Sequence, residues 1–186
     1  MSDEEAGPIL RAIVGALRTA GIPHMLVGSF ASTLHGTPRT TQDIDIVIDP
    51  TPQALEALLE QLPDPRFYVS RDEAREALRR RSMFNVIDIP SGWKIDLMVR
   101  RDRAFSREEL TRGRPATVFG VELPVATAED TVLAKLEWAK AGGSERQLED
   151  VRGILLVQGP HLDHAYLNRW IPQLGVEREW ARVGGL

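Results

Sequence analysis

Thr41-Gln-Asp43-Ile-Asp45-Ile-Val-Ile48 places two aspartates two residues apart in a run of β-branched apolar residues. Residues i and i+2 of a strand point to the same face, about 6–7 Å apart. Asp43 and Asp45 are therefore predicted to project together, while the isoleucines pack on the opposite face. Two carboxylates on one face repel each other, so a cation is expected beside them, and hard oxygen ligands suit Mg²⁺. The alternative is an edge strand whose aspartates are solvated.

A second feature lies just upstream of this strand. Pro23-His-Met-Leu-Val27 is predicted to be a strand, and Gly28-Ser29 follows it, with a spacer of thirteen residues before Asp43. Because Phe30–Leu34 favours a short helix, Gly28-Ser29 lies at a predicted strand-to-helix junction. Glycine there lets the backbone approach a ligand, and the helix start offers N–H groups to an anion. Ser29 could bind a phosphate oxygen or cap the helix, so a plain capped turn is the alternative.

The same alternation predicts a third carboxylate. The segment from Asn85 to Val99 is predicted to be a hairpin with its turn at Pro90-Ser-Gly92. Asp96 is an acid in the middle of the second, otherwise apolar strand. If this strand lies beside Asp43–Ile48, three carboxylates converge, and two metal ions about 3.5–4 Å apart could clamp the oxygens of a phosphoryl transfer. Asp88 is a rival acid, but it lies near the turn and is expected to be solvated.

These residues, in this order, resemble the nucleotidyltransferase superfamily that includes DNA polymerase β. Its signature is Gly-Gly or Gly-Ser after an apolar residue, a spacer, and then two acids flanking one apolar residue. More narrowly, residues 36–45, Ala126–Lys135 and Arg146–Val151 resemble the small bacterial group around the AbiEii-type and MenT-type toxins. The resemblance covers about residues 22–175. It implies a nucleotidyltransferase-like fold and enzyme activity.

The resemblance also implies roles for single residues. Gly28 and Ser29 would bind the triphosphate of a nucleotide. Asp43 and Asp45 would ligate Mg²⁺, for which Mn²⁺ could substitute. Asp96 would help to ligate the catalytic metal and would deprotonate the acceptor hydroxyl.

Two further roles come from the C-terminal part of the motif. Lys135 would contact a phosphate, and Asp150 would close the site from the C-terminal helices. The chain departs from the toxin pattern at Gln147, where that group often carries an acid. The alternatives are that Lys135 extends along the apolar surface of its own helix and that Asp150 is an exposed helix acid.

Arg39 and two histidines are weaker candidates. Arg39 could bind a phosphate of the nucleotide, but an ion pair with Asp43 or Asp49 is the favoured interpretation. His161 and His164 have a helical spacing that could hold a metal ion. Capping and surface roles are favoured for both, because a Gly-Pro turn comes just before them and a third ligand is missing nearby.

Composition excludes several classes of protein. The 186 residues suit one domain, or a sheet-bearing core with a helical lobe, and 42% of them are apolar. The absence of cysteine excludes disulfides, thiolate zinc sites and cysteine nucleophiles. Apolar runs fall short of the roughly 20 residues that span a bilayer, and the acidic start Met1-Ser-Asp-Glu-Glu5 is not typical of a signal peptide. A cytoplasmic enzyme without a membrane partner is expected.

The charge distribution is uneven along the chain. Residues 66–114 carry 13 basic against 8 acidic residues, although the whole chain has a net charge of −4. If these basic residues share a face, they could hold RNA by its phosphates. The alternatives are a compositional bias, since 20 of the 23 basic residues are arginine, and neutralisation by interspersed glutamates such as Glu76.

The hydrophobic periodicities predict an α/β (α+β) fold, a mixed β-sheet flanked by helices. Residues 1–125 are expected to form the nucleotidyltransferase-like catalytic core. Residues 126–186 are expected to form a C-terminal helical subdomain packed on the core and held together by Trp138, Trp170 and Trp180. Helices are predicted over residues 5–20, 52–61, 72–81, 128–141, 145–158 and 163–174, a short turn over 177–183, strands over 23–27, 43–48 and 67–69, and hairpins over 84–99 and 116–124.

The sequence thus predicts a Mg²⁺-dependent nucleotidyltransferase that moves a nucleoside monophosphate from an NTP to an acceptor hydroxyl and releases pyrophosphate. The acceptor could be RNA such as tRNA, a protein or a small molecule. The basic half and the toxin resemblance favour RNA, and a toxin would imply a cognate antitoxin as partner. The alternatives are an inactive module of the same fold that binds a nucleotide or a partner, and a metal-dependent phosphohydrolase, which leaves Gly28-Ser29 without a role.

Overall fold

The computed structural model describes residues 3–41, 43–62 and 65–184, which form two compact units. The sheet unit comprises Met1–Leu26 and Thr41–Val125, and the helical unit comprises Val27–Thr40 and Ala126–Leu186. The sequence placed a single boundary after residue 125. The structure groups residues 27–40 with the C-terminal helices.

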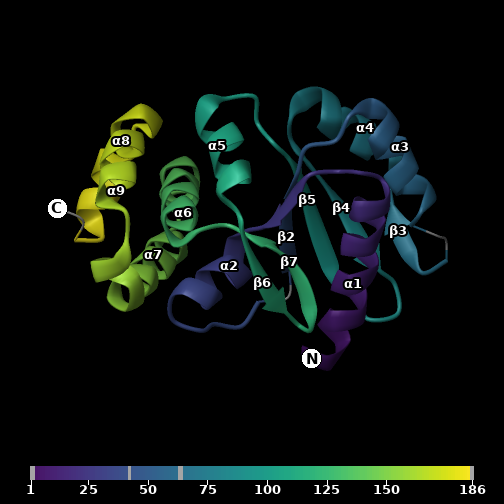
Figure 1. The fold of residues 1–186 in the computed structure, drawn as a ribbon, viewed down its shortest axis with the longest axis horizontal. Helices are drawn as coiled ribbons and strands as arrows, with labels where there is room; N and C mark the ends of the chain where they lie inside the picture. Colours follow the sequence, from purple (N-terminus) through teal and green to yellow (C-terminus); the bar gives the residue numbers. More distant parts are fainter. Residues whose placement is uncertain (1–2, 42, 63–64, 185–186) are drawn as a thin grey trace. The chain divides into compact units, whose positions relative to one another are not determined.

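The sheet unit is built on a seven-stranded mixed sheet (Figure 1) with the order β3-β4-β5-β2-β1-β7-β6. The pairs β2–β5 and β1–β7 are parallel, and the other neighbours are antiparallel. The strands are β1 (His24–Leu26), β2 (Asp43–Ile48), β3 (Phe67–Val69), β4 (Met83–Asp88), β5 (Lys94–Val99), β6 (Arg114–Val118) and β7 (Val121–Val125). The predicted mixed sheet flanked by helices is therefore confirmed.

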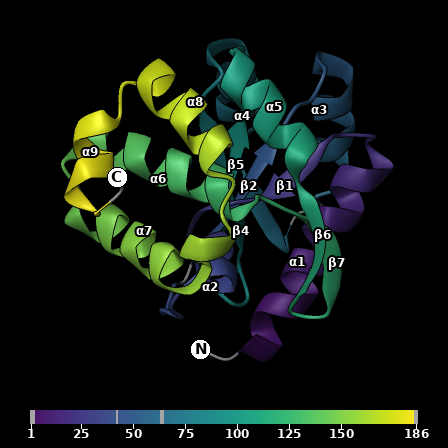
Figure 2. The same cartoon turned by 60° about the vertical axis from the view of Figure 1, so that its left-hand side comes forward.

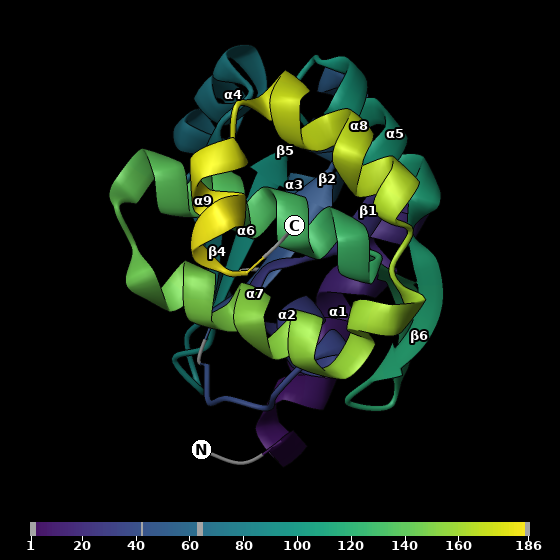
Figure 3. The ribbon, with the colours of Figure 1, turned by 90° about the vertical axis from the view of Figure 1, so that its left-hand side faces the viewer.

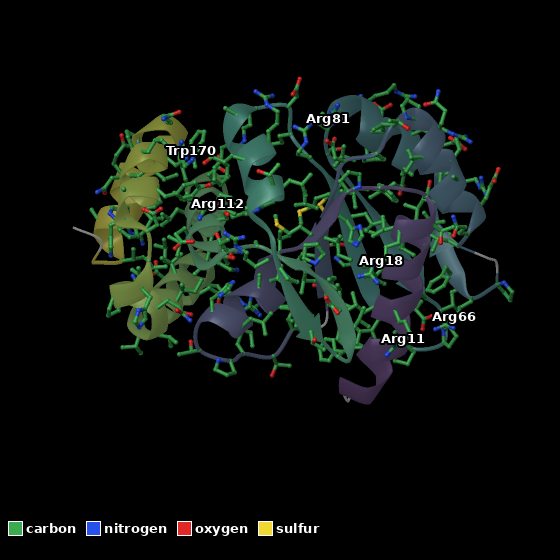
Figure 4. The ribbon with its side chains drawn as sticks, in the orientation of Figure 1. Arg11, Arg18, Arg66, Arg81, Arg112 and Trp170 are labelled. Atoms are coloured by element: carbon green, nitrogen blue, oxygen red, sulfur yellow. The ribbon has the colours of Figure 1, made fainter. Side chains whose placement is uncertain are left out.

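Four described helices belong to the sheet unit, namely α1 (Asp3–Thr19), α3 (Pro52–Glu60), α4 (Arg71–Arg80) and α5 (Ala104–Arg112). The apolar stripe of α1 is buried and consists of Ile9, Leu10, Ile13, Val14 and Leu17. Two arginines fix α1 to the β6–β7 hairpin, because Arg11 donates to the carbonyl of Gly120 and Arg18 to that of Glu122 (Figure 4). Helix α3 starts where Thr51 Oγ1 accepts a hydrogen bond from the backbone N–H of Ala54, as expected for an N-cap.

The helical unit contains α2 (Gly28–His35), α6 (Ala128–Gly142), α7 (Glu145–Gln158), the 3₁₀ turn Gly159–His161, α8 (His164–Leu174) and α9 (Glu177–Arg182). Helix α6 is central, because it contacts α2, α7, α8 and α9 (Figures 2 and 3). Among the described helices of the whole chain, none combines the length and the apolarity that crossing a bilayer requires.

Two sequence predictions about these elements were wrong. Helix α5 was not predicted, because Ala104–Arg112 is mostly polar and lacks a regular apolar stripe. Trp138 was expected inside the helical unit, but half of its surface is exposed, whereas Trp170 and Trp180 are buried as predicted. Trp170 packs edge-to-face on Tyr166, with 6.5 Å between the ring centroids, and Figure 4 shows it on α8.

Two glycines allow α2 and α7 to approach each other closely within the helical unit. A Cβ atom built on Gly36 would lie 2.7 Å from the backbone nitrogen of Ile154. A Cβ on Gly153 would lie 2.5 Å from Thr37 Oγ1. The atoms that a Cβ at Gly36 would meet belong to the backbone of α7, which cannot move aside as a side chain can. The close approach of the two helices therefore requires glycine at this position.

We therefore expect Gly36→Ala to destabilise the protein by about 1–3 kcal/mol, the usual cost of overpacking a well-packed contact. Gly15→Ala is the matched control, since Gly15 lies in α1 with no atom within 4 Å of an added Cβ. That change should be neutral or stabilise by roughly 0.5–1 kcal/mol through helix propensity. Urea unfolding of both variants tests the prediction, and equal stabilities would contradict it.

Candidate active site

Strands β2 and β5 bring acidic residues together in the sheet unit. Ile44, Ile46 and Ile48 are fully buried and alternate with the half-buried Asp43 and Asp45, as the sequence predicted. The parallel pairing with β5 that the sequence required is also present. Its register sets Asp45 opposite Asp96 and Asp43 opposite Lys94. Acids from two strands that are far apart in the sequence are therefore neighbours.

A lysine, which the sequence analysis did not single out, lies between these acids. Lys94 Nζ is 3.1 Å from Asp96 Oδ2 and 3.6 Å from Asp43 Oδ1. Burial disfavours the charged form of Lys94, but the hydrogen bond and charge of Asp96, together with those of Asp43, outweigh this effect and raise the pKa of Lys94. The sequence could have indicated this position of Lys94, because Lys94 and Asp96 have the same two-residue spacing as Asp43 and Asp45 and therefore share one face of their strand.

Asp96 has unused capacity to bind a ligand. Asp96 is buried, with 7% of its surface exposed. Its Oδ1 atom has no hydrogen-bond partner among the residues that the structure describes. An orphaned carboxylate oxygen is costly, so a further partner is expected there. Carboxylate oxygens are the donors that Mg²⁺ prefers, and the set therefore fits such an ion chemically.

Within the described ranges, no three acidic or histidine side chains are arranged to hold a metal ion. Lys94 lies beside the carboxylates that would have to do so.

Gly28-Ser29 lies at a strand-to-helix junction, as predicted. Strand β1 ends at Leu26, and α2 begins at Gly28, two residues before the predicted start. Gly28 has a φ of +65°, a left-handed conformation in which any other residue would be strained. The N-cap residue Val27 makes no side-chain cap bond at this helix start, the part of a helix whose N–H groups can bind an anion.

A partly buried charge cluster in the helical unit connects Ser29 with the three remaining candidates, Arg39, Lys135 and Asp150. Arg39 forms a two-pronged ion pair with Asp150, with Nε–Oδ1 at 2.8 Å and Nη2–Oδ2 at 3.1 Å, and also donates to Ser29 Oγ. Lys135 Nζ lies 2.6 Å from Asp150 Oδ2 and donates to Gln147 Oε1 at 2.9 Å. We call these five residues the Arg39–Asp150 cluster.

The burial of this cluster excludes the alternative positions that were considered for Lys135 and Asp150. Lys135 does not extend along the surface of α6, and Asp150 is not an exposed acid, because both side chains are more than 90% buried. Burial raises the pKa of Asp150, but hydrogen bonds from Arg39 and Lys135 outweigh it and hold the pKa below its usual value. The favoured pairing of Arg39 with Asp43 or Asp49 was wrong, since its partner is Asp150.

Gln147 is a neutral member of the Arg39–Asp150 cluster, so the charges of the other members are not balanced by it. Its amide oxygen satisfies Lys135 as an acid would, but it adds no negative charge. Within the five residues of the cluster, the formal charges of Arg39, Lys135 and Asp150 sum to one positive charge. The departure from the toxin pattern at Gln147 thus leaves a cationic group beside Ser29, which favours an anionic ligand.

Asp88, expected to be solvated, is buried and has a structural role. It accepts hydrogen bonds from Ser91 Oγ at 2.6 Å and from Arg66 Nε at 3.0 Å (Figure 4). Burial raises the pKa of Asp88, but the bonds from Ser91 and Arg66 outweigh it and lower the pKa. The two partners stabilise the β4–β5 turn, where a solvated acid was predicted.

Many basic residues of the 66–114 segment are paired within the sheet unit. Glu76 binds both Arg79 and Arg80 on α4, which confirms the predicted helical pairing at that position. Asp49 binds Arg81 and Arg100, and Figure 4 places Arg81 at the end of α4. Further pairs in this segment are Arg75 with Glu56 and Asp72, and Arg107 with Asp102. Internal pairing reduces the positive charge that this segment can offer to a nucleic acid.

His161 and His164, which were weighed as metal ligands and favoured for capping and surface roles, make local contacts in the structure. His164 Nε2 lies 3.1 Å from the carbonyl oxygen of Gly159, a local contact at the start of α8. His161 ends the 3₁₀ turn. This arrangement agrees with the capping and surface roles that were favoured.

Comparison with solved structures identifies the fold. The antibiotic-resistance factor ANT(2'')-Ia in solution matches 97% of this chain and 99% of its own, with a TM-score of 0.60 and 14% identity. An antigenic nucleotidyltransferase-like protein from Paracoccidioides brasiliensis matches 97% of this chain and 91% of its own (TM-score 0.56, 15% identity). Lincomycin-bound LnuA, a lincosamide antibiotic adenylyltransferase, matches 78% of this chain and 93% of its own (TM-score 0.50, 15% identity).

At these identities the similarity is one of fold, and the chain has a nucleotidyltransferase-like fold. A scan against protein-family models found no match, and a search of curated protein sequences found none either.

The Arg39–Asp150 cluster leads to a stability prediction. Asp150→Ala should destabilise the protein by roughly 3 kcal/mol, because it leaves Arg39 and Lys135 without their shared partner. A group whose pKa is lowered on folding stabilises the protein above its unfolded pKa, and the stabilisation is lost as the pH falls through the folded value. The difference from wild type should therefore be full at pH 7 and shrink below about pH 4.

Urea unfolding at several pH values measures this difference. Glu149→Ala is the matched control, because Glu149 is the adjacent acid on α7 and is exposed. It should change stability by no more than about 0.5 kcal/mol. Equal effects of the two substitutions at pH 7 would show that the cluster contributes nothing to stability.

Proposed function

We propose that this protein is a divalent-metal-dependent nucleotidyltransferase that transfers a nucleoside monophosphate from an NTP to an acceptor hydroxyl and releases pyrophosphate. The observation that carries the proposal is the register of β2 and β5, which sets Asp45 opposite the buried Asp96. The orphaned oxygen of Asp96 adds a free ligand at that point. The nucleotidyltransferase-like fold supports the same chemistry.

The carboxylates of the sheet unit would hold the metal ion. Asp43, Asp45 and Asp96 supply oxygen donors for Mg²⁺ or Mn²⁺, which when bound neutralises phosphate charge and stabilises the oxygens of an in-line displacement. Asp96 would also accept the proton of the acceptor hydroxyl, so that the oxygen can attack the α-phosphorus. The remaining contribution of the protein is to position the reactants.

The helical unit would hold the triphosphate. The N–H groups at the start of α2, which follow the left-handed Gly28, and the Ser29 hydroxyl would bind phosphate oxygens. Arg39 and Lys135 supply the positive charge for phosphate oxygens. Asp150 contacts both cations and would position them, which makes it a positioning residue.

For the acceptor, we propose a small polar molecule that carries hydroxyl groups. ANT(2'')-Ia has been crystallised with adenylyl-2''-tobramycin, and LnuA binds lincomycin. This chain matches nearly the full length of ANT(2'')-Ia, and its arginines are extensively paired internally. The toxin resemblance supports RNA as a second acceptor class, which would bring a cognate antitoxin with it. An inactive nucleotide-binding module would have the same fold without turnover.

The first test is metal-dependent release of pyrophosphate. The protein is incubated with each α-³²P-labelled NTP and Mg²⁺, with an aminoglycoside and lincosamide panel, with total RNA, or alone. Asp45→Asn and Asp96→Asn should each lower the rate on the order of 100- to 1,000-fold, as expected for the loss of a preorganised charge-stabilising group. Asp72→Asn is the control, because Asp72 is an exposed acid of α4.

The labelled product then identifies the acceptor. Label on a small molecule supports the proposed class, whereas label on RNA or on the protein itself would replace it with one of the other two. Nucleotide binding without transfer to any acceptor, and with no effect of Asp45→Asn, would favour the inactive module. Release of orthophosphate from the NTP would instead indicate the phosphohydrolase.

The net charge of the Arg39–Asp150 cluster gives a second test of nucleotide binding. Gln147→Glu adds a negative charge beside Lys135 and should raise the Kd for ATP about tenfold, which corresponds to 1.4 kcal/mol. Gln147→Leu removes the hydrogen bond without adding charge and should have a smaller effect. Titration of a fluorescent ATP analogue in the presence of EDTA isolates this effect from metal binding. Equal weakening by both variants would contradict an electrostatic role.

A further inference from the structure

We propose that Lys94 is a built-in cation that balances the carboxylates of β2 and β5 in the metal-free protein and that a divalent cation must displace it. The proposal rests on the proposed function, because it assumes that these acids bind a metal ion. It concerns only residues of the sheet unit. It assigns to Lys94 control over how tightly the metal binds.

The carboxylates of β2 and β5 need a balancing positive charge. Asp43, Asp45 and Asp96 occupy neighbouring positions on two paired strands, and like charges at such positions repel. Lys94 Nζ lies within 4 Å of two of these three carboxylates. An ammonium group is a compact charge with three donors, so one lysine can serve both acids at once. In the absence of metal, Lys94 therefore holds the acids together.

The ammonium group and a metal ion need the same oxygens. Mg²⁺ binds carboxylate oxygens at about 2.0–2.1 Å. Asp96 Oδ2 already accepts from Lys94 Nζ at 3.1 Å. A metal ion bound there would bring a double positive charge close to the ammonium group, and the two cations would repel. Occupation by one cation therefore excludes the other from this place.

Lys94 is free to leave, whereas Asp96 is not. The Lys94 side chain is 36% exposed and sits on a flexible four-carbon stem, so it can turn into solvent. Asp96 is buried on β5 between β2 and β4. Lys94 also leaves Asp96 Oδ1 without a partner among the described residues, so the ammonium satisfies this carboxylate only in part. Exchange of Lys94 for a metal ion is therefore the step that completes the bonding of Asp96.

The experiment measures Mn²⁺ binding to the full chain by electron paramagnetic resonance, without nucleotide. Lys94→Met removes the charge and should tighten Mn²⁺ binding about tenfold or more. Lys94→Arg keeps a cation at the same position and should remain within about threefold of wild type. Lys140→Met is the matched control, since the Lys140 ammonium donates to the carbonyl of Gly175 in the helical unit. It should leave Mn²⁺ binding unchanged.

Thermal unfolding gives a readout that does not depend on activity. In EDTA, Lys94→Met should unfold at a lower temperature than wild type, because its carboxylates repel each other without a cation. Saturating Mn²⁺ should raise its unfolding temperature by more than it raises that of wild type. If Lys94→Met does not fold, Lys94→Gln provides the same test with a polar side chain.

Failure of this proposal and failure of the proposed function give different results. If Lys94→Met binds Mn²⁺ no more tightly than wild type, while Asp96→Asn abolishes binding, Lys94 is not a competitor and the metal site stands. If the wild type, Lys94→Met and Lys94→Gln all fail to bind Mn²⁺, both proposals are overturned. If Lys94→Met binds Mn²⁺ more tightly than wild type and Lys94→Arg does not, the result supports the exchange of Lys94 for a metal ion.

Discussion

The parallel pairing of β2 with β5 is the constraint on which the sheet unit depends. Three buried isoleucines fix which face of β2 points inward, so the aspartates must share the other face. The register then sets Asp45 opposite Asp96 and Asp43 opposite Lys94. Shifting this register by one residue would bury the aspartates and expose the isoleucines. The hydrophobic core thus determines where the charged groups meet.

The sets of charged side chains in the two units have net charges of opposite sign. In the sheet unit, one lysine lies beside two carboxylates, those of Asp43 and Asp96, so this set is anionic and suited to a cation. In the helical unit, Asp150 faces Arg39 and Lys135, so the set is cationic and suited to phosphate. A metal–nucleotide complex carries both complementary charges. Each set has internal partners in the absence of ligand, which limits the cost of burying it.

Local patterns in the sequence were sufficient for the strands and for the Gly28-Ser29 junction, because alternation and backbone conformation act over a few residues. They failed where a distant partner decides the outcome. Asp88 is buried because Arg66 and Ser91 satisfy it, and Arg39 pairs with an acid 111 residues away. Helix α5 lacks an apolar stripe and is therefore not visible in the sequence pattern. Long-range ion pairs leave no periodic signal.

The helical unit is assembled from two segments of the chain that are far apart. Helix α2 has eight residues, too few to be stable alone, and its partners α6 and α7 begin about a hundred residues later. At a translation rate of about 5–20 residues per second, the ribosome needs roughly 5–20 s to make those partners. Helix α2, which carries Gly28-Ser29, therefore lacks its partners α6 and α7 while most of the sheet unit is being synthesised. A nascent chain stalled before residue 126 would present this segment to chaperones and proteases.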